Sequence, residues 1–553
     1  MNYFEKYKLW KEKVEDEELK KELERLSEEE IEDAFYRNLF FGTGGLRGIL
    51  GAGTNRMNIY VVAKASQGLA NYLNKKYDQP SIAVGFDTRI NSELFAKVSS
   101  EVFTCNGIKV YLFKEPFPVP SLSFAVRYLK CSAGIMITAS HNPSQYNGYK
   151  VYGDDGCQIT TDTAKSIYCE IESIDEFYVK RKSLSDNGLV EFINDDVITE
   201  YIEEVKKQSF LFGEKIDKNI SIVYTPLNGT GLVPVTRVLK EMGYSEIITV
   251  EEQEQPDGNF PTCPYPNPEL REALELGIKC ADENIADILI ASDPDCDRVG
   301  VAVKDNGGFV LLNGNQVGVL LLNYICEQKA KYNMLNGEPV LIKTIVTTDL
   351  ADIVANKFGV KTINVLTGYK FIGEQIGILE KNNRLDDFVF SFEESDGYLS
   401  GTYVRDKDGV NGSCLICEMF AYYKSKKVSL LDKLNDIYAE FGYYVNSLQS
   451  YEYTGSDGLK KMQSIMNQFR RKQLKKIAGI NVKRCNDYLE GIDMLPKSDV
   501  IKIFLEDRSS IVIRPSGTEP KLKVYVSSVR KTMIDSKKIN DKISDCISKM
   551  VKI

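Results

Sequence analysis

The sequence is poor in histidine, because His141 is the only one among 553 residues. A Ser–His–Asp triad therefore has a single candidate base, next to Ser140 in the stretch ITASHNPSQYNGYKVYG. In extended chain, neighbouring side chains point to opposite sides, so we expect His141 to be poorly placed to activate Ser140. The hydrolase elbow G-x-S-x-G is also absent around Ser140. These two absences argue against a serine hydrolase.

An excess of positive charge is missing as well. Lys and Arg number 70 against 79 Asp and Glu, a formal net charge of −9. Nucleic acid and anionic membranes bind basic surfaces, so neither is an expected partner. No apolar run approaches the 18 residues that a membrane span needs, and VGVLLLNYI is typical of a core helix. The charged N-terminal stretch has no apolar signal segment; we expect a solvated helix packed on the outside, with partner binding as the alternative.

The 12 cysteines lack the spacing of a disulfide framework. Cys414 and Cys417 form a CxxC, but neither a second pair nor a histidine accompanies them. They lie in an apolar, helix-like run, so we expect buried helix cysteines rather than a redox or zinc site. Without an export signal, this pattern predicts reduced thiols and a cytoplasmic protein.

The length predicts three or four domains. From about residue 55, short β-branched runs alternate with helical stretches, which is typical of βαβ units with largely parallel sheets. The pattern restarts twice and then gives way to a basic helix, several strands and a closing helix, which predict a smaller α+β domain. The predicted parts are an N-terminal helical extension (1–40), three α/β domains (41–205, 206–312 and 313–440) and the α+β domain (441–553).

Three aspartates at alternate positions, Asp293, Asp295 and Asp297, follow the apolar run ADILIAS. In extended chain their carboxylates lie on one side, where they repel one another and raise their pKa values unless a cation is present. Oxygen ligands beside a phosphate suit Mg²⁺. An EF-hand is excluded, because Arg298 stands where that loop needs glycine. A solvated acidic turn is the alternative.

Two further loops after strand-like runs contain ligand-binding chemistry, since ligands of open α/β sheets bind beyond the carboxyl ends of strands. Glu393 and Ser395 lie on a glycine-bearing turn that suits a polyhydroxylated ligand, with a helix N-cap as the alternative. The planar guanidinium of Arg514 can donate two parallel hydrogen bonds to a phosphate. The alternative interpretation of this loop is a plain Pro–Gly turn without a ligand. The hydroxyls and backbone that can converge on the same anion belong to Ser516, Gly517 and Thr518.

The order of these loops resembles the α-D-phosphohexomutase superfamily of phosphoglucomutases and phosphomannomutases. The motifs that carry the resemblance are TASHNP, DPDCDR, FEESDG and RPSGTEPKLKVY, supported by GTGGLRG and PDGNFPTCPYPNPE, and it spans about Phe41 to the end. GTGGLRG fits no nucleotide-binding pattern. This motif and EESDGYLSGTYVRDKDGV look more like the branch that includes phosphopentomutases and glucose-1,6-bisphosphate synthase than like the bacterial dual-specificity phosphomannomutase/phosphoglucomutases. The expected fold is three successive similar α/β domains with mixed, mostly parallel sheets plus a smaller C-terminal α+β domain, around a central cleft.

The resemblance also implies roles for individual residues. Ser140 would be the phosphoserine and, together with the three aspartates, would hold Mg²⁺. The positions near the transferred phosphoryl group would be Arg47, His141, Lys150 and Arg298. The sugar would be bound by Thr367, Gly368, Lys370, Glu393 and Ser395. The phosphate that does not react would be bound by Arg514, Ser516, Gly517 and Thr518. Cys296 departs from the family's glycine in the metal loop.

The residue chemistry and the family resemblance together predict an enzyme that interconverts a sugar 1-phosphate and a sugar 6-phosphate. Glucose phosphates are the first expectation for the substrate, and mannose phosphates are the second. Phospho-Ser140 would donate its group, form a sugar 1,6-bisphosphate and recover the other phosphate. The alternatives are a phosphopentomutase acting on ribose or deoxyribose 1-phosphate, a phosphatase that uses the same serine, and a non-catalytic sugar-phosphate sensor. Sugar phosphates are the expected partners, and both a monomer and a dimer are compatible with the sequence.

Overall fold

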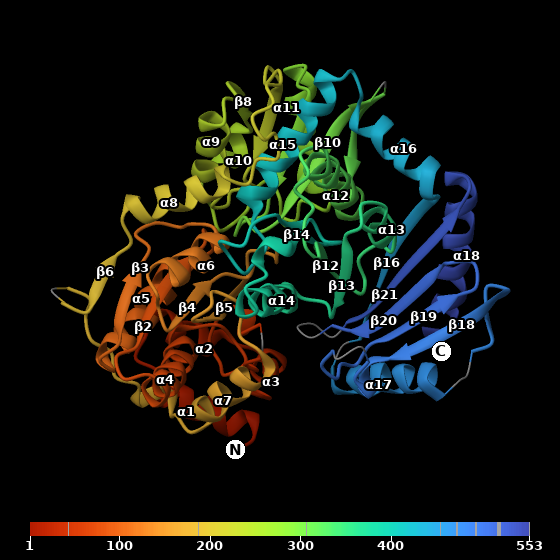
Figure 1. Cartoon of the computed structure of the whole chain (residues 1–553). Helices are drawn as coiled ribbons and strands as arrows, with labels where there is room; N and C mark the ends of the chain where they lie inside the picture. Colours follow the sequence, from red (N-terminus) through yellow and green to blue (C-terminus); the bar gives the residue numbers. More distant parts are fainter. Residues whose placement is uncertain are drawn as a thin grey trace. The chain divides into compact units, whose positions relative to one another are not determined.

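The computed structural model describes residues 1–42, 44–185, 187–305, 307–453, 455–471, 474–492, 495–516 and 521–551 (Figure 1). The chain forms two compact units. The first unit comprises Met1–Asn313, Ile372–Phe388 and Ser395–Ala421. The second comprises Gly314–Phe371, Val389–Glu394 and Tyr422–Ile553.

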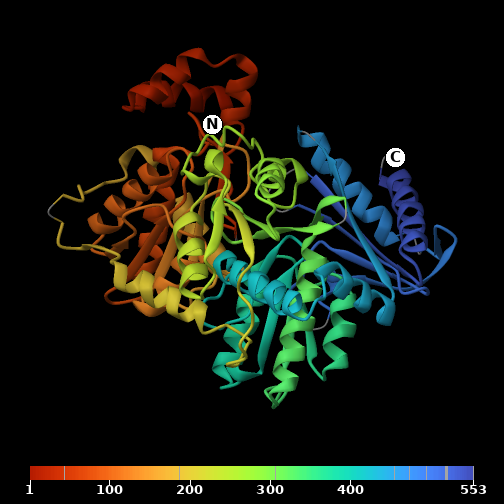
Figure 2. The same ribbon diagram turned by 90° about the horizontal axis from the view of Figure 1, so that it is seen from above.

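Three helices open the first unit: α1 (Tyr3–Lys13), α2 (Glu17–Arg25) and α3 (Glu28–Phe35). Asn2, Asp16 and Ser27 cap them by accepting hydrogen bonds from backbone N–H groups of the first turns. Figure 2 shows these helices, in red, gathered outside the sheet of the first domain. They bury Trp10, Leu23 and Phe35 in a cluster that includes Ala52 and against which Tyr60 and Phe177 pack. The N-terminal stretch is therefore helical, with charged side chains around an apolar contact face.

The first sheet has the strand order β1-β5-β4-β2-β3-β6. Its strands are β1 (Leu46–Ile49), β2 (Ser81–Phe86), β3 (Lys109–Leu112), β4 (Ala133–Ile137), β5 (Tyr146–Gly153) and β6 (Val190–Phe192). Strands β4, β2, β3 and β6 pair in parallel, whereas β5 pairs antiparallel with both β4 and β1. The helices of this part are α4 (Ile59–Lys76), α5 (Ser92–Cys105), α6 (Val119–Tyr128), α7 (Thr161–Glu172), η1 (Glu176–Tyr178) and α8 (Asp195–Lys206). The sheet is mixed because β5 turns back directly after the Ser140 loop.

The second sheet, of the same unit, has the order β11-β10-β9-β7-β8. Its strands are β7 (Ser221–Thr225), β8 (Glu246–Thr249), β9 (Ile288–Ser292), β10 (Val299–Asp305) and β11 (Gly308–Leu312). The helices are α9 (Leu232–Glu241), α10 (Glu251–Glu254), η2 (Arg271–Leu274) and α11 (Glu275–Glu283). Every residue of β7 and β9 is buried, as the continuous apolar runs predict for central parallel strands.

In the second unit, β13 (Lys361–Val365), β12 (Val340–Thr344) and β14 (Phe388–Glu393) lie in that order in one sheet. They are accompanied by α12 (Gly314–Lys331), α13 (Leu350–Lys357), η3 (Leu385–Asp387) and α16 (Leu430–Phe441). The run VGVLLLNYI lies in α12 and is buried, as expected for a core helix. The division between the units falls within α14 (Tyr369–Lys381) and α15 (Gly409–Ser425), while β15 (Gly397–Leu399) belongs to the first unit.

The last sheet is antiparallel, with the order β16-β21-β20-β19-β18-β17. Its strands are β16 (Tyr443–Glu452), β17 (Lys476–Ile477), β18 (Ile480–Asp487), β19 (Ile501–Leu505), β20 (Ser510–Pro515) and β21 (Lys521–Arg530). The helices are α17 (Gly455–Arg471), η4 (Tyr488–Glu490) and α18 (Met533–Val551). An apolar core joins the sheet to both long helices through Phe469 and Ile547. This is the helix-and-strand pattern predicted for the last part of the chain.

None of the helices in the described part of the chain has the length and apolar character needed to cross a bilayer. All 12 cysteines lie within the described residues, and none of them forms a disulfide. Cys414 and Cys417 are buried in α15, as expected for helix cysteines. Burial raises the pKa of both thiols, which keeps them protonated.

Candidate active site

Ser140 lies in the loop between β4 and β5, and its backbone is left-handed, with φ of 53°. A left-handed residue with a side chain is strained, so the surrounding loop must hold it in place. The Thr138 hydroxyl accepts a hydrogen bond from the Ser140 N–H at 2.8 Å. The Ser140 Oγ donates to Asp293 Oδ2 at 2.8 Å. The loop thus directs the serine hydroxyl at the aspartate cluster.

The expectation that His141 points away from Ser140 is wrong. Ser140 Oγ and His141 Nδ1 lie 3.3 Å apart, within hydrogen-bond reach. The expectation assumed extended chain, but the left-handed turn at Ser140 brings the two side chains to the same side. Burial lowers the pKa of His141, and the charges of Arg298 and Arg47 lower it further, so the ring is neutral.

The three aspartates lie in the loop between β9 and β10 and converge. One carboxylate oxygen from each lies within 4.8 Å of the others, and all three residues are fully buried. The loop is a tight turn rather than extended chain, with Cys296 left-handed at φ of 49°. Asp293 Oδ1 closes the turn by accepting from the N–H groups of Asp297 and Arg298, at 3.0 and 3.1 Å. The three carboxylates cluster as predicted, but a tight turn brings them together rather than the alternation of side chains in extended chain.

Two buried lysines neutralise this cluster in part. Lys150, on β5, donates to Asp295 Oδ2 at 2.9 Å and lies 3.5 Å from Asp297 Oδ2. Lys407, in the loop before α15, donates to Asp297 Oδ2 at 2.7 Å. The sequence reasoning missed Lys407, because 110 residues separate it from Asp297. The available signal was the charged run RDKD just before an apolar helix.

The carboxylates carry opposite pKa shifts. Burial raises the pKa of Asp293, and the neighbouring charges of Asp295 and Asp297 raise it further. Burial acts in the same direction on Asp295, but the charge and hydrogen bond of Lys150 outweigh it and lower the pKa. Burial also acts to lower the pKa of Lys150, whereas the charges of Asp295 and Asp297 raise it overall. Three carboxyl groups thus face two lysines, and the raised pKa of Asp293 reflects the cost of a third negative charge in this buried cluster.

A divalent cation fits the residues present. Oδ1 of Asp295 and Oδ1 of Asp297 are buried and have no hydrogen-bond partner among the described residues. A buried carboxylate oxygen without a donor is costly, and a hard cation with oxygen ligands removes that cost. The donor set of three carboxylates beside a hydroxyl contains oxygen alone, which suits Mg²⁺ better than zinc.

Two arginines complete the predicted set in the first unit. Arg47, on β1, donates to Asn142 Oδ1 in the serine loop at 3.4 Å. Arg298 follows the aspartate loop, and its guanidinium donates to Glu269 Oε1. Its Nε lies 3.9 Å from Asp293 Oδ2 and from Asp297 Oδ1. Both guanidinium groups thus border the serine–aspartate centre, which we define as Ser140, Asp293, Asp295 and Asp297.

The predicted sugar-binding residues divide between the units. In the second unit, Glu393 ends β14, and its Oε1 accepts from the Gly368 N–H at 3.1 Å. Thr367 Oγ1 is buried without a hydrogen-bond partner among the described residues, and the Lys370 ammonium lies 5.1 Å from the Phe371 ring. The helix N-cap alternative for Glu393 is wrong, because a turn and β15 follow it. Ser395 belongs to the first unit and is half-buried.

The predicted phosphate loop is described in part. Arg514 lies on β20, and its guanidinium faces Tyr525, with Nη2 3.4 Å from the tyrosine hydroxyl. Its Nε is buried and has no hydrogen-bond partner within the described ranges. The N–H of Ser516 donates to the Lys521 carbonyl at 2.7 Å. Gly517 and Thr518 lie outside the described residues.

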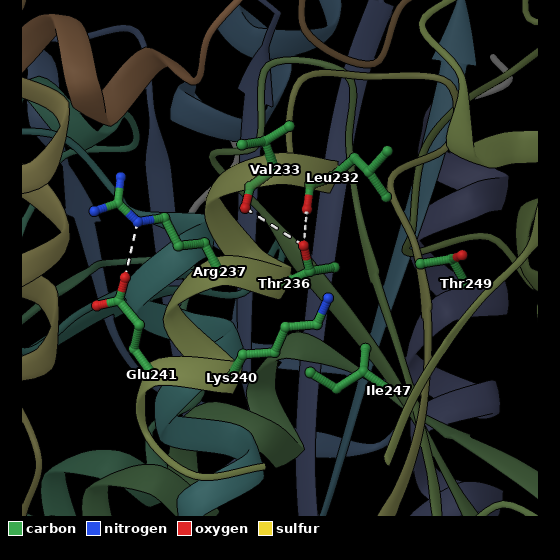
Figure 3. A pocket seen from close by; sticks show the side chains of 8 residues that line it. All are labelled: Leu232, Val233, Thr236, Arg237, Lys240, Glu241, Ile247 and Thr249. Atoms are coloured by element: carbon green, nitrogen blue, oxygen red, sulfur yellow. Dashed lines mark hydrogen bonds and ion pairs between the residues drawn. The ribbon is translucent and has the colours of Figure 1, made fainter. Parts of the chain in front are cut away.

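A pocket of about 580 Å³ lies elsewhere in the first unit, along α9 and β8 (Figure 3). Two of its polar side chains have partners within the pocket wall. The Thr236 hydroxyl donates to the Leu232 carbonyl at 2.7 Å, and Arg237 pairs with Glu241 at 2.8 Å. None of the predicted site residues lines it, so it carries no part of the expected chemistry.

Comparison with known proteins gives the same picture over nearly the whole chain. Models of phosphoglucomutase/phosphomannomutase α/β/α domains I, II and III match residues 38–177, 199–308 and 313–441. The model of the C-terminal domain matches residues 465–532. The chain belongs to the phosphoglucomutase/phosphomannomutase family. This confirms the resemblance and the fold class of three α/β domains with mixed sheets and a C-terminal domain.

The phosphoglucomutase of Staphylococcus aureus strain MSSA476 is 37% identical over 533 residues, which cover 94% of this chain and 95% of that protein. A putative phosphomannomutase of Thermus thermophilus has the same fold, with a TM-score of 0.70, 23% identity and coverage of 94% and 100%. An N-acetylphosphoglucosamine mutase of Aspergillus fumigatus, solved with GlcNAc-6P and magnesium, gives a TM-score of 0.51 at 13% identity, with coverage of 93% and 96%. The protein is thus an intramolecular phosphotransferase of the phosphohexomutase type, and the phosphopentomutase alternative is not favoured.

Proposed function

We propose that this enzyme interconverts glucose 1-phosphate and glucose 6-phosphate through phospho-Ser140 and glucose 1,6-bisphosphate. One observation carries the proposal: the Ser140 hydroxyl lies 2.8 Å from a buried cluster of three carboxylates, two of which have an oxygen without a hydrogen-bond partner among the described residues. A hydroxyl that only stabilised a turn would not need such a cluster. A phosphoryl group on Ser140 adds about −1.5 to −2 charges, which require a cation close by.

The cation that we propose is Mg²⁺, held by Asp293, Asp295, Asp297 and the phosphoryl group on Ser140. The Aspergillus mutase, which was solved with magnesium, supports this choice. When bound, the ion neutralises charge on the transferring phosphoryl oxygens. The same structure contains GlcNAc-6P, which supports a sugar phosphate as the small-molecule partner.

The chain's own residues supply the rest of the transfer. The guanidinium groups of Arg47 and Arg298 border the serine loop and the aspartate loop, where they can neutralise the equatorial oxygens. The neutral ring of His141, 3.3 Å from Ser140 Oγ, is able to accept a proton from a hydroxyl. Lys150, in contrast, is held protonated by Asp295 and Asp297, so it can supply a proton or a positive charge.

Recognition of the sugar and of the phosphate that does not react needs a second set of groups. Glu393, Thr367, Gly368 and Lys370 would bind the sugar. Arg514 and Ser516, with Gly517 and Thr518, would bind the phosphate that does not react. Two observations support the assignment: Thr367 Oγ1 and Arg514 Nε are buried polar atoms without partners among the described residues, as expected where a ligand supplies the partner.

The test compares products on several sugar phosphates. The enzyme, with Mg²⁺ and a trace of glucose 1,6-bisphosphate, should convert glucose 1-phosphate to glucose 6-phosphate without releasing inorganic phosphate. Turnover of mannose 1-phosphate and of ribose 1-phosphate, measured in parallel, shows whether the enzyme also accepts these sugars. Phosphate release in step with substrate loss would identify a phosphatase instead, and binding without turnover would identify a sensor. Turnover of the pentose alone would overturn the choice of glucose. The location that we propose is cytoplasmic, with which 12 free thiols are compatible.

A further inference from the structure

Arg89 is a buried arginine that none of the steps above uses. It lies just after β2 and is 3% exposed. Its guanidinium donates to four backbone carbonyls, three in the loop that carries Ser140 and one at the first residue of β5. Nη1 donates to Pro143 and Tyr146 at 2.9 and 3.1 Å, and Nη2 donates to Ser140 and Asn142. One side chain therefore connects the backbone of Ser140 with that of the start of β5.

Asp87 holds the guanidinium in place from the other side. Its Oδ2 lies 3.4 Å from Arg89 Nε, and both side chains are fully buried. The Asp87 Oδ1 accepts from the N–H of Arg89 at 2.9 Å and from the Ser92 hydroxyl at 2.7 Å. The carboxylate is thus tied to the start of α5 as well as to Arg89. A charged pair fixed at both ends is a rigid anchor for the four carbonyls that it faces.

The segment PDGNFPTCPYPNPE, at positions 256–269, packs against the same arginine. The Phe260 ring lies 5.0 Å from the Arg89 guanidinium carbon, and Gly258 forms a β-bridge with Arg89. A side chain at Gly258 would collide with the backbone of Arg89 and Thr88. At its other end, Glu269 accepts a hydrogen bond from Arg298. The segment therefore connects the anchor of the serine loop to the arginine beside the aspartates.

We propose that Arg89, seated on Phe260, is a positioning residue that holds Ser140 in its left-handed conformation and so aims the phosphoryl group at the aspartates. The left-handed conformation at Ser140 is strained, so an unanchored loop would relax to another conformation. In the anchored loop the Ser140 hydroxyl lies 2.8 Å from Asp293 Oδ2. Relaxation of the loop would turn the hydroxyl away from this carboxylate. The proposal rests on the role of Ser140 as the phosphoryl carrier.

Arg89→Lys tests the proposal, because it keeps the charge but cannot reach four carbonyls. We expect kcat to fall by about 10²-fold, as displacement of a reacting group by about 1 Å does. KM for glucose 1-phosphate should stay within about twofold, since Arg89 touches no substrate. Single-turnover transfer of phosphate from labelled glucose 1,6-bisphosphate to the protein, normalised to the folded fraction by circular dichroism, should slow by the same factor as kcat.

Arg56→Lys is the matched control. Arg56 is also largely buried and binds the backbone carbonyls of Asp33 and Asn55, but it does not contact the serine loop. It should cost stability with kcat unchanged. Phe260→Leu is the second test variant, for use if Arg89→Lys does not fold, because it removes the ring on which Arg89 lies. It should lower the single-turnover rate of phosphate transfer to the protein several-fold. Equal kcat for folded Arg89→Lys and wild type would overturn the proposal, as would an unchanged rate in Phe260→Leu.

Ser140→Ala separates this proposal from the one on which it rests. If that variant keeps full turnover, the carrier role of Ser140 fails, whatever Arg89 does. If it is inactive while folded Arg89→Lys transfers phosphate at the wild-type rate, the carrier role stands and the positioning role of Arg89 is rejected.

Discussion

Ser140 Oγ donates a hydrogen bond to Asp293 Oδ2 across 2.8 Å, although 153 residues separate them in the chain. Two strands of different sheets, β4 and β9, end at this contact. Because the pKa of Asp293 is raised by burial and by its acidic neighbours, the pair is sensitive to any cation placed beside it.

Ser140→Ala should abolish turnover and phosphate incorporation together. Intact-mass measurement of wild-type enzyme incubated with glucose 1,6-bisphosphate should show one added phosphoryl group, and peptide mapping should place it at position 140. The alanine variant should show none. It should remain folded, since loss of one hydrogen bond to a buried carboxylate costs about 1–3 kcal/mol. A phosphoryl group found on a different residue would contradict the carrier role.

Asp295→Asn should remove a metal ligand, and because it also removes the charge that faces the buried Lys150, turnover is normalised to the folded fraction. The side chain keeps its shape, but its charge and one strong oxygen ligand are lost, so Mg²⁺ affinity falls. We expect turnover to drop by about 10³-fold at fixed Mg²⁺, in line with the several kcal/mol that a catalytic cation supplies. Turnover measured against Mg²⁺ concentration checks this. Asp282→Asn, an exposed carboxylate on α11, is the control and should leave the curve unchanged.

Lys407→Met should make folding depend on the metal. Lys407 Nζ is 2.7 Å from Asp297 Oδ2, and both side chains are buried. Removing one partner of a buried pair costs about 3–5 kcal/mol, because it leaves an uncompensated charge. A divalent cation would replace the missing charge, so Mg²⁺ should raise the melting temperature of the variant more than that of wild type.

Lys433→Met is the control for that comparison. Its ion pair with Glu327, 2.7 Å apart, belongs to the second unit and does not involve the aspartate cluster. Mg²⁺ should not stabilise this variant beyond the wild-type effect. Equal Mg²⁺ shifts for Lys407→Met and wild type would contradict the role of Lys407 as a partial substitute for the cation.

The fold was predictable because its signals are local. The continuous apolar runs before Asp293 and before Ser140 become the buried strands β9 and β4, and VGVLLLNYI becomes the core of α12. Each motif ends a strand, so the position of the candidate chemistry at strand ends was predictable as well. The three aspartates lie within five consecutive residues, which is why their clustering could be read from the sequence.

The rest of the site depends on backbone angles and distant contacts that a single sequence does not contain. His141 was misplaced because nothing in TASHNP indicates that Ser140 is left-handed. Lys407 and Arg89 were missed because each reaches the centre from a segment far away in the chain. A buried lysine or arginine looks the same in sequence as a solvated one, and only the fold reveals which carbonyl or carboxylate it meets.

Thiol labelling should follow burial rather than position in the sequence. Burial raises the pKa of Cys131 to about 12 and that of Cys263 to about 11, whereas Cys105, Cys169 and Cys485 are exposed. At pH 8 the native protein should be alkylated by iodoacetamide at the three exposed cysteines, with Cys131 and Cys263 protected. Mass spectrometry of peptides checks this, and denatured protein, in which all thiols react, is the control.

The same shifts predict a loss of stability in alkali. The folded-state pKa of each buried thiol is above its unfolded value of about 8.5, so the folded state keeps a proton that the unfolded state releases. Stability is therefore fully present below about pH 8.5 and declines above it, toward pH 11 for Cys263 and pH 12 for Cys131. Urea unfolding at pH 8, 9 and 10 measures the slope. Cys263→Ala should reduce the slope, and Cys105→Ala should not.

Trp10, the only tryptophan, should report whether the N-terminal helices unfold with the domain. Its ring is 1% exposed and packs edge-on against Phe35, Tyr60 and Phe177, within 5.7 Å of each. Because Tyr60 belongs to α4, the fluorescence emission of Trp10 reports on the contact between the N-terminal helices and the first domain. Wild-type protein should show blue-shifted emission that iodide quenches poorly.

Leu23→Ala should loosen that contact selectively. Leu23 is fully buried in α2, and its truncation costs about 2–5 kcal/mol. Trp10 emission should then shift to the red at a lower urea concentration than the loss of far-UV circular dichroism, which is dominated by the larger domains. Glu24→Ala, exposed on the same helix, should leave the two transitions as in wild type. Coincident transitions in Leu23→Ala would show that the extension is an inseparable part of the first domain.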